Sequence, residues 1–212
     1  EICEKTWQTL VSGRSSVKFK RRDHLAIDHQ QVDHLICITK GRVKNSGVFP
    51  NGKEMVFEFF DAPAIIGYHA LFRGHPESCF PYIAALEDTE CVFVPIKEAE
   101  GIIYSSPELM RAIIISITNI LTITRQQASW NWNTNLNYTK KVAYALMFTK
   151  YAATDASGYF AVTHEELASF VGISRTNVTA AINQLHSLGF IDKQFGKIKV
   201  FDPDKLDAFI HS

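Results

Sequence analysis

The chain has 212 residues, of which 46% are hydrophobic and 21% are charged. This composition is typical of a folded globular protein and excludes an intrinsically disordered chain. The 22 Lys and Arg residues balance the 22 Asp and Glu residues, so net charge alone predicts neither a nucleic-acid nor a membrane partner. The most apolar stretch, Ile113–Ile117, is interrupted by Ser116 and is much shorter than a bilayer span. We therefore expect no membrane partner.

The cysteines are widely spaced and form no Cys-x-x-Cys pair. They are Cys3, Cys37, Cys79 and Cys91. In a chain of this length, so few cysteines favour reduced thiols in a cytoplasm over a disulfide framework. Whether any of them has a redox role is left open by the sequence.

Short apolar runs separated by turn residues fill residues 17–95. The runs are Leu35–Ile38, Val43–Phe49, Met55–Phe60, Ile83–Leu86 and Cys91–Pro95. Asn51-Gly52 predicts a hairpin between the second and third runs, because Asn-Gly readily takes the positive φ of a tight turn. Many short strands with regular turns indicate a β-sandwich or a barrel-like β-roll, which we assign to residues 1–104.

A long helix is predicted to begin at Pro107 and to run to about Trp130, within a segment spanning residues 105–134. Ser106 can cap it, Pro107 suits the first helical position, and Glu108 suits the positive end of the helix dipole. Side chains recur at steps of three and four along Met110, Ile113, Ile117, Ile120, Thr124 and Gln127. We interpret this seam as a dimer interface, with packing inside one subunit as the alternative.

Asparagines at alternate positions of Trp130–Asn137 compete with helical hydrogen bonds and predict a hinge. Residues 135–212 then form a small domain of their own. Within it, Thr163 and Glu166 have capping-box spacing and predict a helix from about His164. Gly172 predicts the end of that helix, and Ser174 caps a second one.

Small and apolar residues have the spacing of a helix-turn-helix in this region, and a bare helical hairpin is the alternative. Ala168 lets the two helices approach each other. Two short runs, Gly189–Lys193 and Lys197–Phe201, surround Gly196 and predict a β-hairpin wing. The wing would bring Lys193 and Lys197 close to DNA phosphates.

Taken together, these motifs resemble the CRP/FNR superfamily of bacterial transcription regulators over nearly the whole chain. The matching segments are Ile38–Val43, Asn51–Glu54, Ile65–Gly67 with Leu71-Phe72, Pro107, and Val171–Val178. The resemblance implies an α+β protein with a cupin-like, cyclic-nucleotide-binding-like β-roll that serves as effector domain. It also implies a homodimer formed along the long helix and a winged helix-turn-helix that binds a palindromic DNA operator.

The expected DNA contacts lie at the starts of the two helices and in the wing. They are Thr163, His164, Ser174, Arg175, Thr176, Asn177, Thr179 and Lys197. Thr176 and Ala180 replace a base-reading glutamate and an arginine that are usual in the family, so the operator should differ from the usual half-sites. Arg175 could bind guanine bidentately, and Asn177 could read adenine.

The effector site departs from that of the cyclic-nucleotide binders in the family. Tyr68 follows Gly67 where those proteins have glutamate, and Ser78-Cys79 stands where they have Arg-Ser, so we do not expect cyclic AMP to act. A small organic molecule is expected instead, as in the halorespiration regulators, which bind chlorinated phenols. The candidate contacts are Tyr68, His69, Phe72, Ser78, Cys79, Thr124 and Gln127, although the aromatic residues could equally fill the core.

Other functions remain as alternatives. Cys3 alone cannot hold an iron–sulfur cluster, whereas haem ligation by Cys79 with His69 or His75 would make the chain a redox- or gas-responsive regulator. A signalling module that lacks DNA binding is disfavoured by the helix-turn-helix. No nucleophile, base and orienting group cluster as in an enzyme, and we expect no bound metal or cofactor. RNA polymerase would be a further partner if the chain is an activator.

Overall fold

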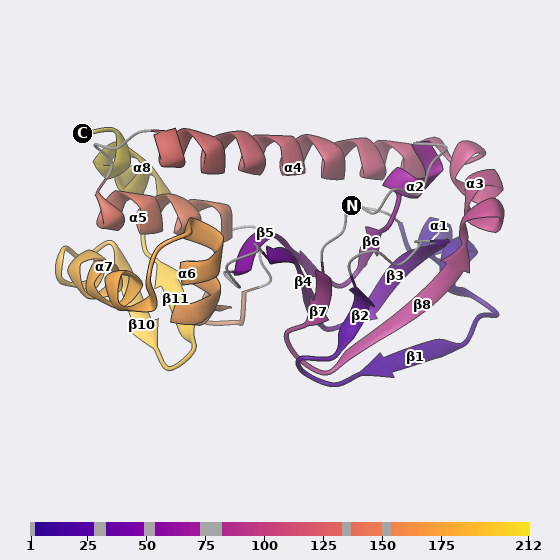
Figure 1. The fold of residues 1–212 in the computed structure, drawn as a ribbon, viewed down its shortest axis with the longest axis horizontal. Helices are drawn as coiled ribbons and strands as arrows, with labels where there is room; N and C mark the ends of the chain where they lie inside the picture. The colour runs from indigo at the N-terminus through magenta and orange to yellow at the C-terminus, as the bar shows by residue number, and fades with distance from the viewer. Residues whose placement is uncertain (1–2, 28–32, 49–53, 73–81, 133–136, 150–153) are drawn as a thin grey trace. The chain divides into compact units, whose positions relative to one another are not determined.

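The computed structural model describes residues 3–27, 33–48, 54–72, 82–132, 137–149 and 154–212. The chain divides into two compact units. The first comprises Glu1–Lys53 and Phe57–Thr122, and the second comprises Glu54–Val56 and Ile123–Ser212. Figure 1 shows the elements of both units along the chain.

Two four-stranded sheets form the β-roll. One has the order β1 (Ser16–Phe19), β8 (Thr89–Pro95), β3 (His34–Lys40) and β6 (Ala64–Ile66). The other has the order β2 (His24–Ile27), β7 (Tyr82–Ala85), β4 (Arg42–Val48) and β5 (Glu54–Asp61). The five apolar runs are thus confirmed as β3, β4, β5, β7 and β8, while the Asn51-Gly52 turn lies outside the described residues.

Alternation along β3 separates two apolar clusters. Ile36 and Ile38 pack with residues of both sheets, among them Phe60 and Ile83, in the interior of the roll. Leu35 and Cys37 point to the other face of the same sheet and pack against helices. Because side chains alternate across a strand, the unbroken apolar run Leu35–Ile38 serves both clusters.

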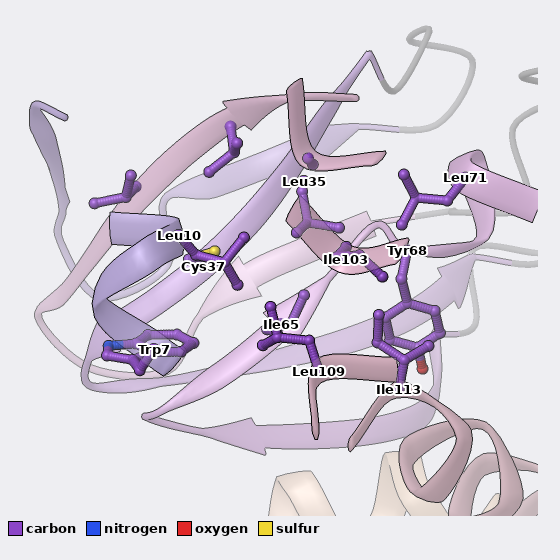
Figure 2. Close-up of a cluster of buried hydrophobic side chains, with 13 residues drawn as sticks. Trp7, Leu10, Leu35, Cys37, Ile65, Tyr68, Leu71, Ile103, Leu109 and Ile113 are labelled. Carbon is purple, nitrogen blue, oxygen red and sulfur yellow. The ribbon is translucent and has the colours of Figure 1, made fainter. Parts of the chain in front are cut away.

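The helices of the first unit cover this second face, as Figure 2 shows. They are α1 (Glu4–Val11), α2 (His69–Phe72), α3 (Ile96–Tyr104) and the first part of α4 (Pro107–Trp132). Leu109 and Ile113 of α4 are fully buried here, and Met110, Ile117 and Ile120 pack against the same cluster. Packing inside one subunit is therefore confirmed for Ile113, whereas the dimer interface stays a prediction for Met110, Ile117 and Ile120, which are only partly buried.

A second apolar face of α4 is exposed. Ile114, Ile115 and Leu121 have exposed fractions of 56%, 45% and 53%. By length and composition alone, Pro107–Ser129 could also cross a membrane, a test that the core helix of a soluble protein passes as well. Arg111 and Arg125 lie on the helix, and charged side chains near a bilayer core are costly.

The second unit contains the helices α5 (Tyr138–Thr149), α6 (His164–Val171), α7 (Arg175–Ser187) and α8 (Pro203–His211). Its three-stranded sheet has the order β10 (Ile191–Gln194), β11 (Lys197–Val200) and β9 (Phe160–Ala161). The two helices and the wing predicted from the sequence are confirmed as α6, α7 and the β10–β11 hairpin. The expected hinge falls mostly on residues 133–136, which lie outside the described residues.

The buried seam of α4 gives the first prediction. Ile113→Ala should lower the free energy of unfolding by about 2–5 kcal/mol, because it leaves a cavity in a packed core. The surface change Val17→Ala should stay within about 0.5 kcal/mol. Urea unfolding measures both values. A loss at Ile113 that depended on protein concentration would instead assign the seam to a partner chain.

Candidate nucleic-acid interface and effector site

Local hydrogen bonds fix the turn between α6 and α7. The Thr163 hydroxyl accepts from the Glu166 amide at 3.1 Å, and the Glu166 carboxylate accepts from the Thr163 amide at 2.7 Å. Gly172 ends α6 with a φ of 76°, a conformation that suits glycine. The Ser174 hydroxyl then accepts from the amide of Asn177 at 3.2 Å. The predicted capping box, turn and second cap are all confirmed.

Buried side chains hold the two helices together. They are Leu167, Ala168, Phe170 and Val171 of α6, and Val178, Ala181, Ile182 and Leu185 of α7. Because these residues occupy one face of α7, the opposite face remains exposed.

The exposed face of α7 is polar at most of its positions. Arg175, Thr176, Thr179, Ala180 and Asn183 line an open hollow of about 400 Å³. Their spacing of one, three, one and three residues places them on one stripe of the helix. Arg175 and Thr176 at its N-terminal end are exposed. Asn183 belongs to the same surface, although the sequence analysis did not select it.

Thr179 is engaged within the protein. Its hydroxyl donates to the carbonyl oxygen of Arg175 at 3.0 Å and lies 2.9 Å from Nδ1 of His164. With the hydroxyl proton used in this way, the imidazole is the donor in the second contact. Burial lowers the pKa of His164, and the charges of Arg175 and Lys193 lower it further. His164 and Thr179 therefore position the start of α7, and positive charge gathers beside them.

The wing supplies lysines that already contact other side chains. The Nζ atom of Lys197 lies 2.8 Å from a carboxylate oxygen of Asp155, and this hydrogen bond is the main reason that the pKa of Asp155 is lowered. Lys193 instead bonds to the side-chain oxygen of Asn183 on α7. Of the two wing lysines expected near phosphates, Lys193 is thus the one tied directly to the exposed face of α7.

Among the predicted effector residues, Tyr68 lies in the interior of the first unit. It is 4% exposed, and Figure 2 shows it in the cluster with Leu109 and Ile113 of α4. Its hydroxyl lies 3.0 Å from the hydroxyl of Ser116 on α4. Phe72 is 47% exposed, so it does not share this environment.

The other predicted effector residues do not join Tyr68. Ser78, Cys79 and the side chain of His69 lie outside the described residues. Thr124 and Gln127 belong to the second unit. Thr124 is exposed, whereas Gln127 is buried and donates to the carbonyl oxygens of Val56 at 3.1 Å and Phe170 at 3.2 Å. Gln127 is therefore engaged with the protein backbone.

A buried carboxyl group, absent from the sequence prediction, is Glu58. Burial alternates along β5, so Val56, Glu58 and Phe60 share the inner face. Among the described residues, one oxygen of Glu58, Oε2, has no hydrogen-bond partner. Burial raises the pKa of Glu58 to about 8. The sequence pattern that could have indicated this group is a glutamate at an inward position of an otherwise aromatic and aliphatic strand.

Glu58 and Tyr68 influence each other. Burial raises the pKa of Tyr68 to about 12; its hydrogen bond with Ser116 opposes this shift, and the charge of Glu58 adds to it. Glu58 on β5 is therefore close enough for its charge to act on Tyr68, which lies two residues after β6. Both stay protonated at neutral pH.

Two buried cysteines have no sign of reactivity. Cys37 and Cys91 are fully buried, and burial raises the pKa of each thiol to about 12. A thiol must lose its proton to react or to bind a metal. Within the described part of the chain, no group of three His, Cys, Asp or Glu side chains is arranged to hold a metal ion.

The buried carboxyl group gives a pH prediction. The pKa of Glu58 is about 8 in the folded chain against an ordinary value of 4.5. Between these two pH values, Glu58 is ionised in the unfolded chain and protonated in the folded chain. The contribution of the Glu58 carboxyl to stability is therefore fully present below pH 4.5 and is lost as the pH rises towards 8. Relative to Glu58→Gln, the wild type should lose up to about 1.4 kcal/mol per pH unit in this range. Urea unfolding at several pH values tests this, and parallel curves for the two proteins would refute it.

The comparisons with known proteins agree with this architecture. Residues 16–105 match the family model of the cyclic nucleotide-binding domain, and residues 140–209 match that of the Crp-like helix-turn-helix domain. The chain is 25% identical to the regulatory protein YeiL of Escherichia coli O157:H7 over 116 residues, which is 52% of each chain. It thus spans about half the length of that relative.

Two further similarities extend over most of the chain. The global nitrogen regulator of Nostoc sp. is 21% identical over 189 residues, covering 87% of this chain and 84% of that one. The solved structure of TTHA1359, a CRP/FNR family transcriptional regulator of Thermus thermophilus, superimposes with a TM-score of 0.68 and 23% identity over 93% of this chain and 99% of that one. With a cyclic-nucleotide-binding type of roll, a long helix and a Crp-like helix-turn-helix, the chain belongs to the CRP/FNR family of DNA-binding transcription regulators.

Proposed function

We propose that the chain is a cytoplasmic, effector-responsive regulator that binds a palindromic operator as a homodimer and is not an enzyme. The observation that carries this proposal is the exposed polar face of α7, which begins at Arg175 and has Lys193 of the wing attached through Asn183. A face of this kind fits the major groove, with positive charge towards the phosphates. RNA polymerase is a further partner if the regulator activates transcription.

The dimer interface that we propose is the exposed face of α4. Ile114 and Leu121 are seven residues apart, which is two helical turns, and both are more than half exposed. A soluble helix that shows such a stripe usually buries it against a partner. Ile115 widens the same apolar surface. Ile113 cannot serve this purpose, because it is fully buried inside the chain, whereas Ile117 and Ile120 remain partly exposed beside the interface.

The dimer proposal predicts the behaviour of a charge variant. Ile114→Glu combined with Leu121→Glu should convert a dimer at micromolar concentration into a monomer, because two pairs of carboxylates would face each other in a desolvated interface. Sedimentation equilibrium measures the mass. Leu188→Glu, at a residue 51% exposed in the other unit, is the matched control and should remain dimeric. A wild-type monomer without DNA or effector would contradict the interface.

Base reading is assigned to the start of α7. Arg175 is exposed, and its contact with the exposed carboxylate of Glu165 is long, at 3.9 Å, so its guanidinium could turn to a guanine edge. Asn177, half-buried in the first turn, could read adenine. We assign Lys193 and Lys197 to phosphates. Lys197 would exchange Asp155 for a phosphate, which costs little because exposed ion pairs are weak.

This assignment predicts different losses for two variants. Arg175→Ala should weaken operator binding by about 1–3 kcal/mol and relax the preference at one base pair in each half-site. Lys193→Ala should weaken binding to all sequences alike and reduce the salt dependence by about one unit of slope. Titrations of the operator and a single-base variant at two salt concentrations separate the two effects. An equal loss on every sequence for Arg175→Ala would assign Arg175 to a phosphate instead.

The effector that we propose is a small organic molecule and not cyclic AMP. Where cyclic-nucleotide binders of the family have a glutamate, Tyr68 is buried and bonded to Ser116. Redox sensing by Cys37 or Cys91 is disfavoured, because both thiols are buried and protonated. Buried polar atoms of the roll that have no hydrogen-bond partner are then the candidates for the effector site.

A further inference from the structure

Two oxygen atoms inside the roll have no hydrogen-bond partner among the described residues. They are Oε2 of Glu58 and Oδ1 of Asn45, and both are buried. Asn45 on β4 pairs across the sheet with Ile83 on β7, and Ile83 belongs to the interior cluster together with Phe60 of β5. Directly paired residues face the same side of a sheet. The side chain of Asn45 therefore points to the same interior as that of Glu58.

The guanidinium of Arg42 is close to Glu58 in the sheet but contacts other side chains. Arg42, also on β4, has its Nε atom 3.4 Å from a carboxylate oxygen of Asp61 and its guanidinium 4.9 Å from the ring centre of Phe59. Phe59 is adjacent to Glu58 on β5 and points to the opposite face of the sheet. Burial alone accounts for the raised pKa of Glu58, with no lowering contribution from a cation.

Unsatisfied buried acceptors are costly to a folded protein. Leucine or methionine at position 58 would remove that cost and keep the apolar pattern of the strand. A chain that keeps such a group gives up stability, and sites of this kind are frequently functional. A ligand that brings donors would remove the cost only when it is bound.

We propose that Glu58, Asn45, Tyr68 and Ser116, here called the acceptor cluster, bind the effector, and that this effector is a small organic cation with an amidinium or ammonium group on an apolar body. The inference rests on the proposed function, because it names the ligand of the same regulator. An amidinium offers two parallel N–H donors to a carboxylate, and the apolar body would pack beside Tyr68.

An anionic effector does not suit the acceptor cluster. The protonated Glu58 carboxyl could donate one hydrogen bond to an anion, but the cluster holds no cation to compensate the buried negative charge. Binding of a cation has a defined proton balance. The protonated Glu58 carboxyl releases its proton to solvent, and the resulting carboxylate pairs with the cation.

Three planar probes of nearly equal shape test the charge preference on the full chain. They are benzamidine, benzamide and benzoate, which carry one positive, no and one negative charge, and cyclic AMP serves as a second anion. Millimolar benzamidine should raise the melting temperature, benzamide should raise it less, and the two anions should leave it unchanged. Stabilisation by an anion equal to that by benzamidine, or no response to benzamidine, would overturn the proposal.

Substitutions at position 58 test whether Glu58 causes the thermal response to benzamidine. Glu58→Gln should weaken benzamidine binding by more than about tenfold, because it removes the charge of a charge-assisted pair. Glu100→Gln, at an exposed position of α3, should bind as the wild type does. Glu58→Leu should melt at or above the wild-type temperature without benzamidine and should not respond to it. A lower melting temperature for Glu58→Leu would show a structural role and overturn the assignment.

Calorimetry in buffers of different ionisation enthalpy adds an independent readout. At pH 7, the wild type should release about one proton for each benzamidine bound, and Glu58→Gln should release none. Equal proton release by the two proteins would also overturn the assignment.

Operator binding by the wild type is measured in parallel. Its absence would refute the regulator function, whereas normal operator binding with no cation preference would refute the ligand class alone.

Discussion

Helix α4 is held by one face against the β-roll, and much else depends on this contact. Leu109 and Ile113 are buried in the cluster that also receives Trp7 of α1 and Ile103 of α3. Because Leu109 and Ile113 are fully buried, a partner can reach the opposite face, with Ile114 and Leu121, and the exposed parts of Ile117 and Ile120. The packing inside the chain therefore determines which residues a dimer can use. The same contact brings Ser116 to the hydroxyl of Tyr68.

Elements with local causes could be predicted from the sequence. The start of α6 follows from Thr163 and Glu166, three residues apart, and its end follows from Gly172. Ser174 caps α7 in the same local way. The strands of the roll were visible because each is a short apolar run between turn residues. In all these cases, the residues that decide the structure are neighbours in the chain.

Features that depend on distant contacts could not be predicted in the same way. The recurrence of apolar residues through Ile113 and Ile117 shows that one face of α4 is buried, but periodicity does not say by what. Residues of the roll cover it in the structure. Likewise, the pairing of Lys197 with Asp155 joins residues 42 positions apart. An inward glutamate such as Glu58 is visible only once the inner face of β5 is known.

An effector can control a regulator only if it binds two states of the protein with different affinity. The acceptor cluster offers a physical basis for that difference, because it includes Ser116, which is adjacent in sequence to Ile115 on the exposed face of α4. The Tyr68–Ser116 contact connects the roll to α4 through two hydroxyl groups that could both turn to a ligand. A bound cation that drew the Tyr68 hydroxyl towards Glu58 would change how this turn of α4 is held. Since the neighbouring residues form the proposed dimer face, occupancy of the cluster and packing of the dimer would then be coupled through one helical turn, without requiring a change in the fold of either unit.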